Sequence, residues 1–197
     1  MSGAPAAPLL LASTSPQRRA ILEQLRIPFD VVPPRYEEHD PPDADAVELV
    51  RTHAREKARS VAGDAGDRPV LGVDTAVVLD GRLYGKPADA GDAERMLEAL
   101  AGETHVVVSG LCLITPGWEL VEHDSTRVTF RPLTPRDLAT YVASGEWEGR
   151  AGGYAIQGLG ASLVEEIDGD YLNVVGLPAA LLVRLLAERF AGVYGFG

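Results

Sequence analysis

Apolar residues recur along this chain with two periods, and breaks rich in Gly, Pro and Asp separate the segments. A period of about 3.6 residues predicts a helix, and a short uninterrupted apolar run predicts a buried strand. Helices are expected at 17–25, 46–61, 89–100, 134–144 and 178–190. Strands are expected at 8–12, 29–32, 70–74, 104–114 and 119–130, with a hairpin over 75–84 and two short strands around Asp168-Gly169-Asp170. Because strands and helices alternate early and strands follow one another later, we predict an α/β fold with a central mixed sheet.

The junction between the first strand and the first helix carries polar residues suited to an anion. Ser15 is placed to cap the helix, and Pro16 fits its first position because proline lacks an N–H. The free amides of this first turn, the hydroxyl of Ser13 and the guanidinium of Arg18 would then face one loop. An ordinary capped helix with surface arginines explains the same residues, and Arg19 is expected to be a surface charge. This segment alone leaves both interpretations open.

Only two of the eighteen basic residues are lysines, Lys57 and Lys86. An ammonium group is a compact point charge suited to phosphate oxygens, so a scarce lysine is a candidate binding residue. Lys57 falls on the apolar stripe of the second predicted helix, and Lys86 follows the predicted hairpin; neither position is typical of a solvated charge. Asp74 ends a buried apolar run, where a carboxylate is costly unless it meets a cation, a metal or a proton donor. Each of the three residues is therefore a candidate site residue, and chance retention of the two lysines is the alternative.

An acidic, proline-rich loop is predicted over residues 33–45. Its carboxylates Glu37, Glu38 and Asp40 are oxygen ligands of the kind that a hard divalent cation prefers. A solvated acidic loop is the alternative, and we expect it to describe at least two of the three. A second loop is predicted over 149–160, which has five glycines and is not expected to enter the core.

Composition and charge exclude several classes of protein. The net charge of −11 argues against binding nucleic acid or an anionic membrane. The single cysteine, Cys112, lies in an apolar run and rules out an intrachain disulfide framework, so we expect a cytoplasmic protein. No apolar run approaches the roughly 18 residues of a membrane span, and the first residues lack the basic region of a secretory signal. The length fits one domain over residues 1–197.

Three familiar site patterns are incomplete in this chain. The segment Gly81-Arg82-Leu83-Tyr84-Gly85-Lys86 is one residue shorter than a P-loop, and Pro87 replaces its hydroxyl residue. The segment Val73-Asp74-Thr75-Ala76 has the first aspartate of haloacid-dehalogenase-like phosphatases, but Ala76 stands where the second is required. An aspartyl-phosphate mechanism is therefore the weaker alternative. The four histidines lack zinc-site spacing and are interpreted as ordinary residues.

Six segments taken in order resemble the Maf family of nucleoside triphosphate pyrophosphatases over almost the whole chain. They are Leu11-Ala12-Ser13-Thr14-Ser15-Pro16-Gln17-Arg18-Arg19, Ala54-Arg55-Glu56-Lys57-Ala58, Gly72-Val73-Asp74-Thr75, Gly85-Lys86-Pro87, Tyr154-Ala155-Ile156-Gln157-Gly158 and Val175-Gly176-Leu177-Pro178. The resemblance implies a two-lobed fold like that of inosine triphosphatases, with a nucleoside triphosphate in a central cleft. It implies hydrolysis to a monophosphate and pyrophosphate with a divalent metal, Mg²⁺ or Mn²⁺, and a homodimer is a family-level expectation.

The resemblance also implies catalytic roles. Asp74 would be the general base that activates water, and Glu38 would hold the metal together with Asp74. Arg18, Lys57 and Lys86 would bind the phosphates. Asp74, Glu38, Lys57 and Lys86 would form the catalytic set, and Arg18 would belong to the substrate-binding residues.

The remaining matched positions concern substrate binding. Ser13 and Ser15 would contribute to the phosphate site, and Thr75 and Gln157 match the branch similar to dTTP/UTP pyrophosphatases. The branch that acts on 7-methyl-GTP carries Gln and Glu at those two positions. Gln17 stands where the first branch usually has arginine and the second has tryptophan. Because a planar amide cannot supply arginine's charge, we expect looser selection among bases than in that branch.

Two alternatives concern the activity itself. The chain could be a nucleotide-binding regulator of cell division and septum formation without significant turnover. It could also be a 7-methyl-GTP or broad-specificity pyrophosphatase. The leading hypothesis is hydrolysis of dTTP, UTP and modified pyrimidine nucleotides, which would keep non-standard nucleotides from polymerases.

Overall fold

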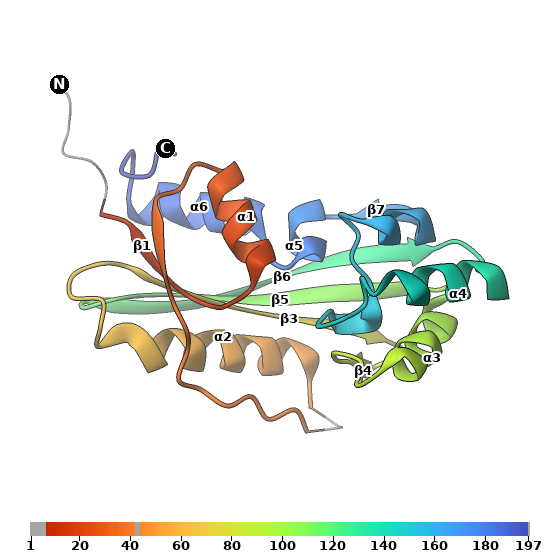
Figure 1. Cartoon of the computed structure of the whole chain (residues 1–197). Coiled ribbons are helices and arrows are strands. Elements are labelled where there is room, and N and C mark those ends of the chain that lie inside the picture. The colour runs from red at the N-terminus through yellow and green to blue at the C-terminus, as the bar shows by residue number, and fades with distance from the viewer. Residues whose placement is uncertain (1–6, 42–43, 197) are drawn as a thin grey trace.

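The computed structural model describes residues 7–41 and 44–196 and contains a seven-stranded mixed sheet with helices on both faces (Figure 1). The strands are β1 (Leu9–Ala12), β2 (Phe29–Val32), β3 (Val70–Leu79), β4 (Arg82–Tyr84), β5 (Thr104–Thr115), β6 (Trp118–Phe130) and β7 (Val164–Asp168). The α-helices are α1 (Pro16–Gln24), α2 (Ala46–Ala62), α3 (Ala90–Leu100), α4 (Pro135–Ser144), α5 (Tyr171–Val175) and α6 (Ala179–Arg189), and the 3-10 helices are η1 (Ala151–Gly153) and η2 (Leu159–Leu163). The predicted α/β class is confirmed.

The sheet has the strand order β2-β1-β3-β5-β6-β7, with β4 paired to β3. β1 runs parallel to both β2 and β3, whereas β3, β5, β6 and β7 are antiparallel to their neighbours. Asp80 and Gly81 both have positive φ and form the predicted two-residue turn between β3 and β4. The long strands β3, β5 and β6 run the length of the molecule and connect its two ends (Figure 1).

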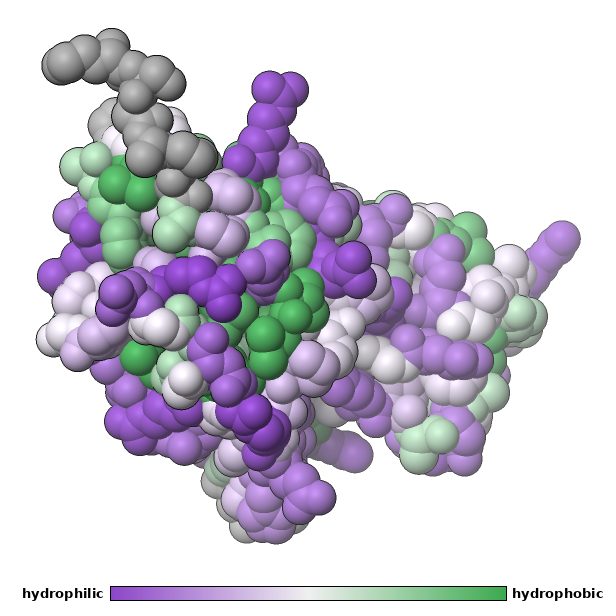
Figure 2. Space-filling model, turned by 60° about the vertical axis from the view of Figure 1, so that its left-hand side comes forward, coloured by the Kyte–Doolittle hydropathy of each residue, from purple (hydrophilic) through white to green (hydrophobic). Residues whose placement is uncertain are grey.

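Separate apolar cores lie at the two ends of these long strands. At one end, α1 and α6 cover one face of the sheet and α2 covers the other (Figure 1). At the other end, Phe130 and Tyr141 belong to a core that α3, α4 and η2 close. Figure 2 shows the surface narrowing between a larger and a smaller part. These two ends are the lobes of the predicted two-lobed fold.

Two glycines allow α2 to lie unusually close to the sheet. A Cβ at Gly72 of β3 would collide with the carbonyl oxygen of Ala54, and a Cβ at Gly110 of β5 would collide with that of Val50. Gly110 is the register partner of Asp74. Because side chains on a strand alternate, Gly72 and Asp74 face α2 together. Because these two glycines have no side chains, α2 can approach the sheet closely enough for Lys57 to contact Asp74.

Local sequence signals place the helix ends. The Ser15 side chain caps α1 and Pro16 occupies its first turn, as predicted. At α4, Thr134 and Asp137 form a reciprocal capping box, and Gly145 ends the helix in the left-handed conformation. These contacts satisfy amides and carbonyls that the helix itself leaves unpaired.

Three sequence predictions about local structure are wrong. Strand β3 continues without a break from 70 to 79, because its pairing with β5 spans Asp74 and Thr75. The second strand expected after Asp168 is instead α5, whose first turn is capped by the Asp170 side chain. The glycine-rich segment 149–160 enters the core of the smaller lobe, where Tyr154 and Ile156 are buried. Its glycines permit the positive φ angles at which the chain turns inward.

None of the helices within 7–41 and 44–196 combines the length and the apolar composition needed to cross a membrane.

Candidate active site in the central cleft

A cleft of about 900 Å³ lies between the two lobes and takes residues from both. Strand register explains why it opens over β3. On one edge of β3, Val70 and Leu71 pair with β1, whereas 77–79 pair with β4. The intervening residues, 72–76, therefore lie between the end of β1 and β4, and this stretch contains Asp74 and Thr75. The site is thus placed where a parallel strand ends and the sheet has room for a ligand.

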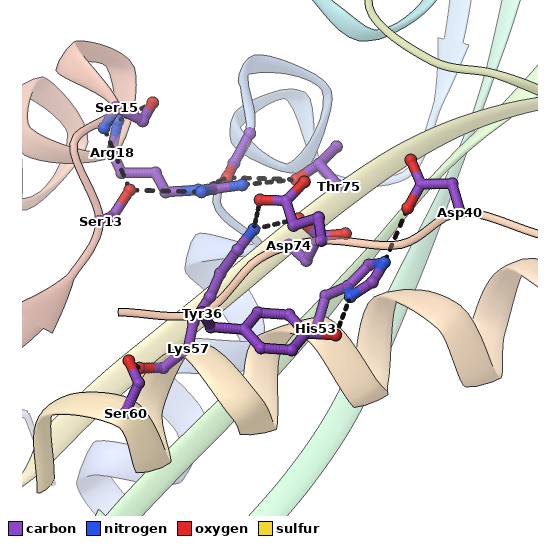
Figure 3. A network of polar contacts seen from close by, with 12 residues as sticks. Ser13, Ser15, Arg18, Tyr36, Asp40, His53, Lys57, Ser60, Asp74 and Thr75 are labelled. Carbon is purple, nitrogen blue, oxygen red and sulfur yellow. Dashed lines mark hydrogen bonds and ion pairs between the residues drawn. The ribbon is translucent and has the colours of Figure 1, made fainter. Parts of the chain in front are cut away.

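Lys57 of α2 joins two carboxylates on one side of this stretch (Figure 3). Its Nζ donates to Asp74 Oδ1 at 2.5 Å and lies 2.7 Å from Glu38 Oε1. Lys57 is 5% exposed and Asp74 is 9% exposed, so the pair is largely removed from water. Charges at such distances interact more strongly there than at a solvated surface. The buried lysine expected from the apolar stripe of the helix is confirmed.

Arg18 of α1 holds the other side of the site. Its Nε donates to the carbonyl oxygen of Gly176 at 2.9 Å, and its two terminal nitrogens donate to Ser13 Oγ at 3.3 Å and Thr75 Oγ1 at 3.4 Å. Thr75 Oγ1 also lies 2.8 Å from Ser109 Oγ. These contacts fix the guanidinium plane at the N-terminus of α1, where the helix dipole also favours an anion.

The first turn of α1 presents polar groups beside Arg18. Ser15 Oγ accepts the amide N–H of Arg18 and donates to Gln17 Oε1 at 3.1 Å. Ser13 Oγ accepts a hydrogen bond from the amide N–H of Ser15, and the Ser13 residue is 3% exposed. Both serines and Gln17 line the cleft. Ser13, Ser15 and Arg18 therefore lie together at the cleft, in an arrangement that could bind an anion.

The pKa values follow from this arrangement of charges. Burial alone would raise the pKa of Glu38, but the hydrogen bond and charge of Lys57, with the charge of Lys86, outweigh it and lower the pKa below its ordinary value. Burial lowers the pKa of Arg18, while the charges of Asp74 and Glu38 act to raise it. A guanidinium remains protonated in either case. Glu38 is therefore held ionised by its contact with Lys57 and by the charge of Lys86.

Nine of the ten residues singled out from the sequence line the cleft. They are Ser13, Ser15, Gln17, Arg18, Glu38, Lys57, Asp74, Thr75 and Lys86. Lys86 is exposed there, contrary to the expectation that neither lysine is solvated. Gln157 is exposed and is not among the lining residues. It follows the buried Tyr154–Ile156 segment, whose inward path leaves the Gln157 side chain outside the cleft.

Several residues of the site carried no clear sequence signal. Arg82, Glu148 and Arg150 reach the cleft from the smaller lobe. His53 lies under the acidic loop and contacts both Tyr36 and Asp40 (Figure 3). The sequence predicts that His53 is an ordinary residue, although its spacing of four from Lys57 puts both on one face of α2. That spacing was the available signal.

The chemistry of the donor set fits a hard divalent cation. Glu38 and Asp74 each direct one carboxylate oxygen at Lys57, and each has a second oxygen with which to bind a metal. Mg²⁺ commonly uses one or two protein carboxylates and takes its other ligands from phosphates and water. Among the described residues, no group of three or more His, Cys, Asp and Glu side chains is arranged to enclose an ion by itself. The two carboxylates suit a metal that is shared with a phosphate substrate.

Comparison with known proteins identifies the family of this chain. A Maf-like protein family matches residues 8–189. A "dTTP/UTP pyrophosphatase" of Nitratidesulfovibrio vulgaris is 50% identical, over 93% of this chain and 89% of the relative. One of Gloeobacter violaceus is 49% identical, over 91% of this chain and 95% of the relative. A solved Ham1 protein from Coxiella burnetii has a TM-score of 0.44 and 19% identity, over 78% of this chain and 90% of the other. The family match and the two relatives show that this chain belongs to the Maf family.

Proposed function

We propose that this chain hydrolyses nucleoside triphosphates, dTTP and UTP among them, to the nucleoside monophosphate and pyrophosphate. The observation that carries the proposal is the contact of Asp74 and Glu38 with one buried ammonium, Lys57, in a cleft that also presents Arg18. The names of the two relatives support the substrate assignment. The cleft combines fixed cations for phosphates with carboxylates for proton and metal binding.

Asp74 is suited to accept a proton from the attacking water. Its carboxylate lies on β3 at the floor of the cleft, and Lys57 fixes one of its oxygens. The water oxygen would form a bond to the α-phosphorus as the proton passes to Asp74. The bond from the α-phosphorus to the bridging oxygen would break, and pyrophosphate would leave with that oxygen. Only a correctly positioned water can follow this path, so the fixed carboxylate contributes orientation as well as basicity.

The cations would hold the triphosphate during this step. Arg18 is fixed by three neighbours and can face phosphate oxygens with its planar fork. Lys57 would stabilise negative charge close to Asp74, and Lys86 would approach from the exposed side of the cleft. Glu38 and Asp74 would hold Mg²⁺ or Mn²⁺, which when bound neutralises phosphate charge.

Base selection is proposed to rest on Thr75 and Gln17, which both line the cleft. Thr75 is tied to Ser109 and Arg18, so its position is defined on the α1 side of the strand. The role of Gln157 stays a prediction from the family resemblance, since its side chain is exposed outside the cleft.

Product analysis with dTTP and Mg²⁺ or Mn²⁺ tests the proposal. The expected products are dTMP and pyrophosphate in equal amounts, and in ¹⁸O-water the label should appear in dTMP. Label in pyrophosphate would place the attack on the β-phosphorus, and release of orthophosphate with dTDP would contradict the reaction. Binding of dTTP without turnover with either metal would instead favour the regulatory alternative, which the names of the relatives do not support.

A further inference from the structure

The segment that carries Glu38 is attached to α2 by a histidine that the proposed reaction does not use. His53 Nε2 lies 2.8 Å from Asp40 Oδ1, and His53 Nδ1 lies 2.9 Å from the hydroxyl of Tyr36. Tyr36 and Asp40 stand two residues before and two residues after Glu38. One imidazole ring therefore holds both sides of the segment that presents the carboxylate (Figure 3).

The carboxylate of Asp40 sets the direction of both hydrogen bonds of His53. An ionised carboxylate only accepts hydrogen bonds, so His53 Nε2 carries the proton and donates to Asp40. In the tautomer that donates through Nε2, Nδ1 is an acceptor, and the hydroxyl of Tyr36 donates to it. Both ring nitrogens are satisfied in a side chain that is 3% exposed.

Helix and loop geometry connect this contact to the active site. His53 and Lys57 are four residues apart and lie on one face of α2. In an extended segment, residues two apart point the same way, so Tyr36, Glu38 and Asp40 can face the helix together. Lys57 contacts Glu38, the central residue of the three, and His53 contacts Tyr36 and Asp40 on either side of it.

Glu38 has little else to fix it. Its side chain is 37% exposed, and its one ion pair among the described residues is with Lys57. Upstream, Arg35 contacts Ser60 and Asp64, but the side chains of Arg35 and Asp64 are 63% and 46% exposed, and these contacts hold the segment from one side only. A mobile carboxylate loses orientation, because each freely rotating bond lowers the population of the productive geometry. The buried ring of His53 is the contact that fixes the segment on both sides of Glu38.

We propose that His53 is a positioning residue that clamps the Glu38 segment onto α2 and so sets the Glu38 carboxylate against Lys57. The inference rests on the proposed function for its effect on turnover, whereas the clamp itself is a property of the free protein. It assigns a role to Tyr36 and Asp40 as the two contacts through which His53 acts.

The test compares His53→Leu, which removes both contacts, with His53→Gln and His53→Asn, which each retain one amide group near a ring nitrogen. His39→Gln is the matched control, because His39 lies in the same segment and is exposed. Hydrogen exchange of the metal-free and nucleotide-free protein should be faster over 35–41 in His53→Leu and unchanged in the control. With dTTP, kcat should fall about tenfold or more in His53→Leu while KM changes little, since outer contacts of this kind affect activity about 10- to 100-fold. His53→Gln or His53→Asn should recover part of the loss.

Exchange over 35–41 equal to that of the unmodified chain would overturn the clamp, as would kcat within twofold in His53→Leu. If His53→Leu does not fold, Tyr36→Phe and Asp40→Ala each remove one contact without altering the buried ring, and they are held to the same two outcomes. Failure of the proposed reaction would appear as absent turnover in the unmodified chain, and the exchange result would still decide the clamp.

Discussion

Asp74 and Thr75 are neighbours in β3 and face opposite sides of the sheet. Asp74 meets Lys57 on the α2 side, whereas Thr75 meets Arg18 on the α1 side. A strand alternates its side chains in this way, so two adjacent residues can belong to two different layers of the molecule. This stretch of β3 lies between the residues that pair with β1 and those that pair with β4. Asp74 and Thr75 therefore both line one cleft, although they face opposite sides of the sheet. The proposed base and the proposed selectivity residue are thereby fixed to one rigid element.

Replacing Asp74 by asparagine should remove the proton acceptor while keeping the shape of the side chain. We expect kcat for dTTP to fall about 100- to 10,000-fold, the usual contribution of a general base. Steady-state kinetics measures the change, and urea unfolding verifies the fold. Asp80→Asn is the control, because Asp80 lies in the exposed turn after β3 and asparagine tolerates its positive φ. A near-normal rate in Asp74→Asn would remove Asp74 from this role.

Lys57→Arg tests whether a point charge is required at this position. Two carboxylates from different elements meet one nitrogen in a largely buried site, and a planar guanidinium is too large to reproduce that contact. We expect kcat/KM for dTTP to fall about tenfold or more, a loss of about 1.4 kcal/mol. The exposed Arg95→Lys serves as the reverse control, with activity unchanged. Equal activity of Lys57→Arg and the unmodified chain would show that any cation suffices.

Gly72→Ala should test the close approach of α2. The new Cβ would meet the carbonyl oxygen of Ala54 and the side chain of Ala58, so the helix must shift. Overpacking of this kind costs about 1–3 kcal/mol of unfolding free energy. At Gly117 a Cβ would meet nothing within 4 Å, so Gly117→Ala should change stability by no more than about 0.5 kcal/mol. Urea unfolding midpoints compare the two, and equal midpoints would mean that the approach is not tight.

His105 should make stability depend on pH below neutrality. Burial lowers its pKa from 6.5 to about 4, so the unfolded chain binds a proton more readily than the folded chain. The stabilising contribution is complete above pH 6.5 and is lost as the pH falls toward 4, amounting to about 3 kcal/mol.

His105→Phe should lower stability at neutral pH, because it leaves the hydroxyl of Tyr154 without its partner. It should also lose less stability than the unmodified chain between pH 7 and pH 4.5. Urea unfolding at both values measures this difference, and the exposed His123→Phe is the control. Parallel pH dependence in His105→Phe and the unmodified chain would contradict the prediction.

Gln17→Arg should sharpen selection among bases. The Gln17 amide accepts a hydrogen bond from Ser15 and lines the cleft, and an arginine there would add a charged donor. A hydrogen bond to a charged group contributes about 1.5–3 kcal/mol, so the preference for dTTP over GTP should rise about tenfold. Competition assays with dTTP, UTP, CTP, GTP and 7-methyl-GTP measure the ratios. Unchanged ratios would show that position 17 does not face the base.

Short-range signals in the sequence predicted most of the helices and strands. Ser15 with Pro16, Thr134 with Asp137, and Asp80 with Gly81 each act over a few residues, and each formed the expected cap or turn. The errors concern segments whose conformation depends on distant partners. The amide of Asn173 donates to Val107 and Thr126, which lie on the long strands, and this contact holds α5 against the sheet where a strand was expected.

The sequence by itself determined the α/β class, the family, and nine residues that line the cleft, because their types and local spacing carry that information. Only the tertiary structure decided which of them meet. The contact of Lys57 with Asp74 depends on Gly72 and Gly110, because a side chain at either position would collide with the backbone of α2. The tertiary structure also decided that His53 contacts Tyr36 and Asp40 and that Gln157 lies outside the cleft. Such contacts arise from close packing between elements far apart in the chain, which no local pattern encodes.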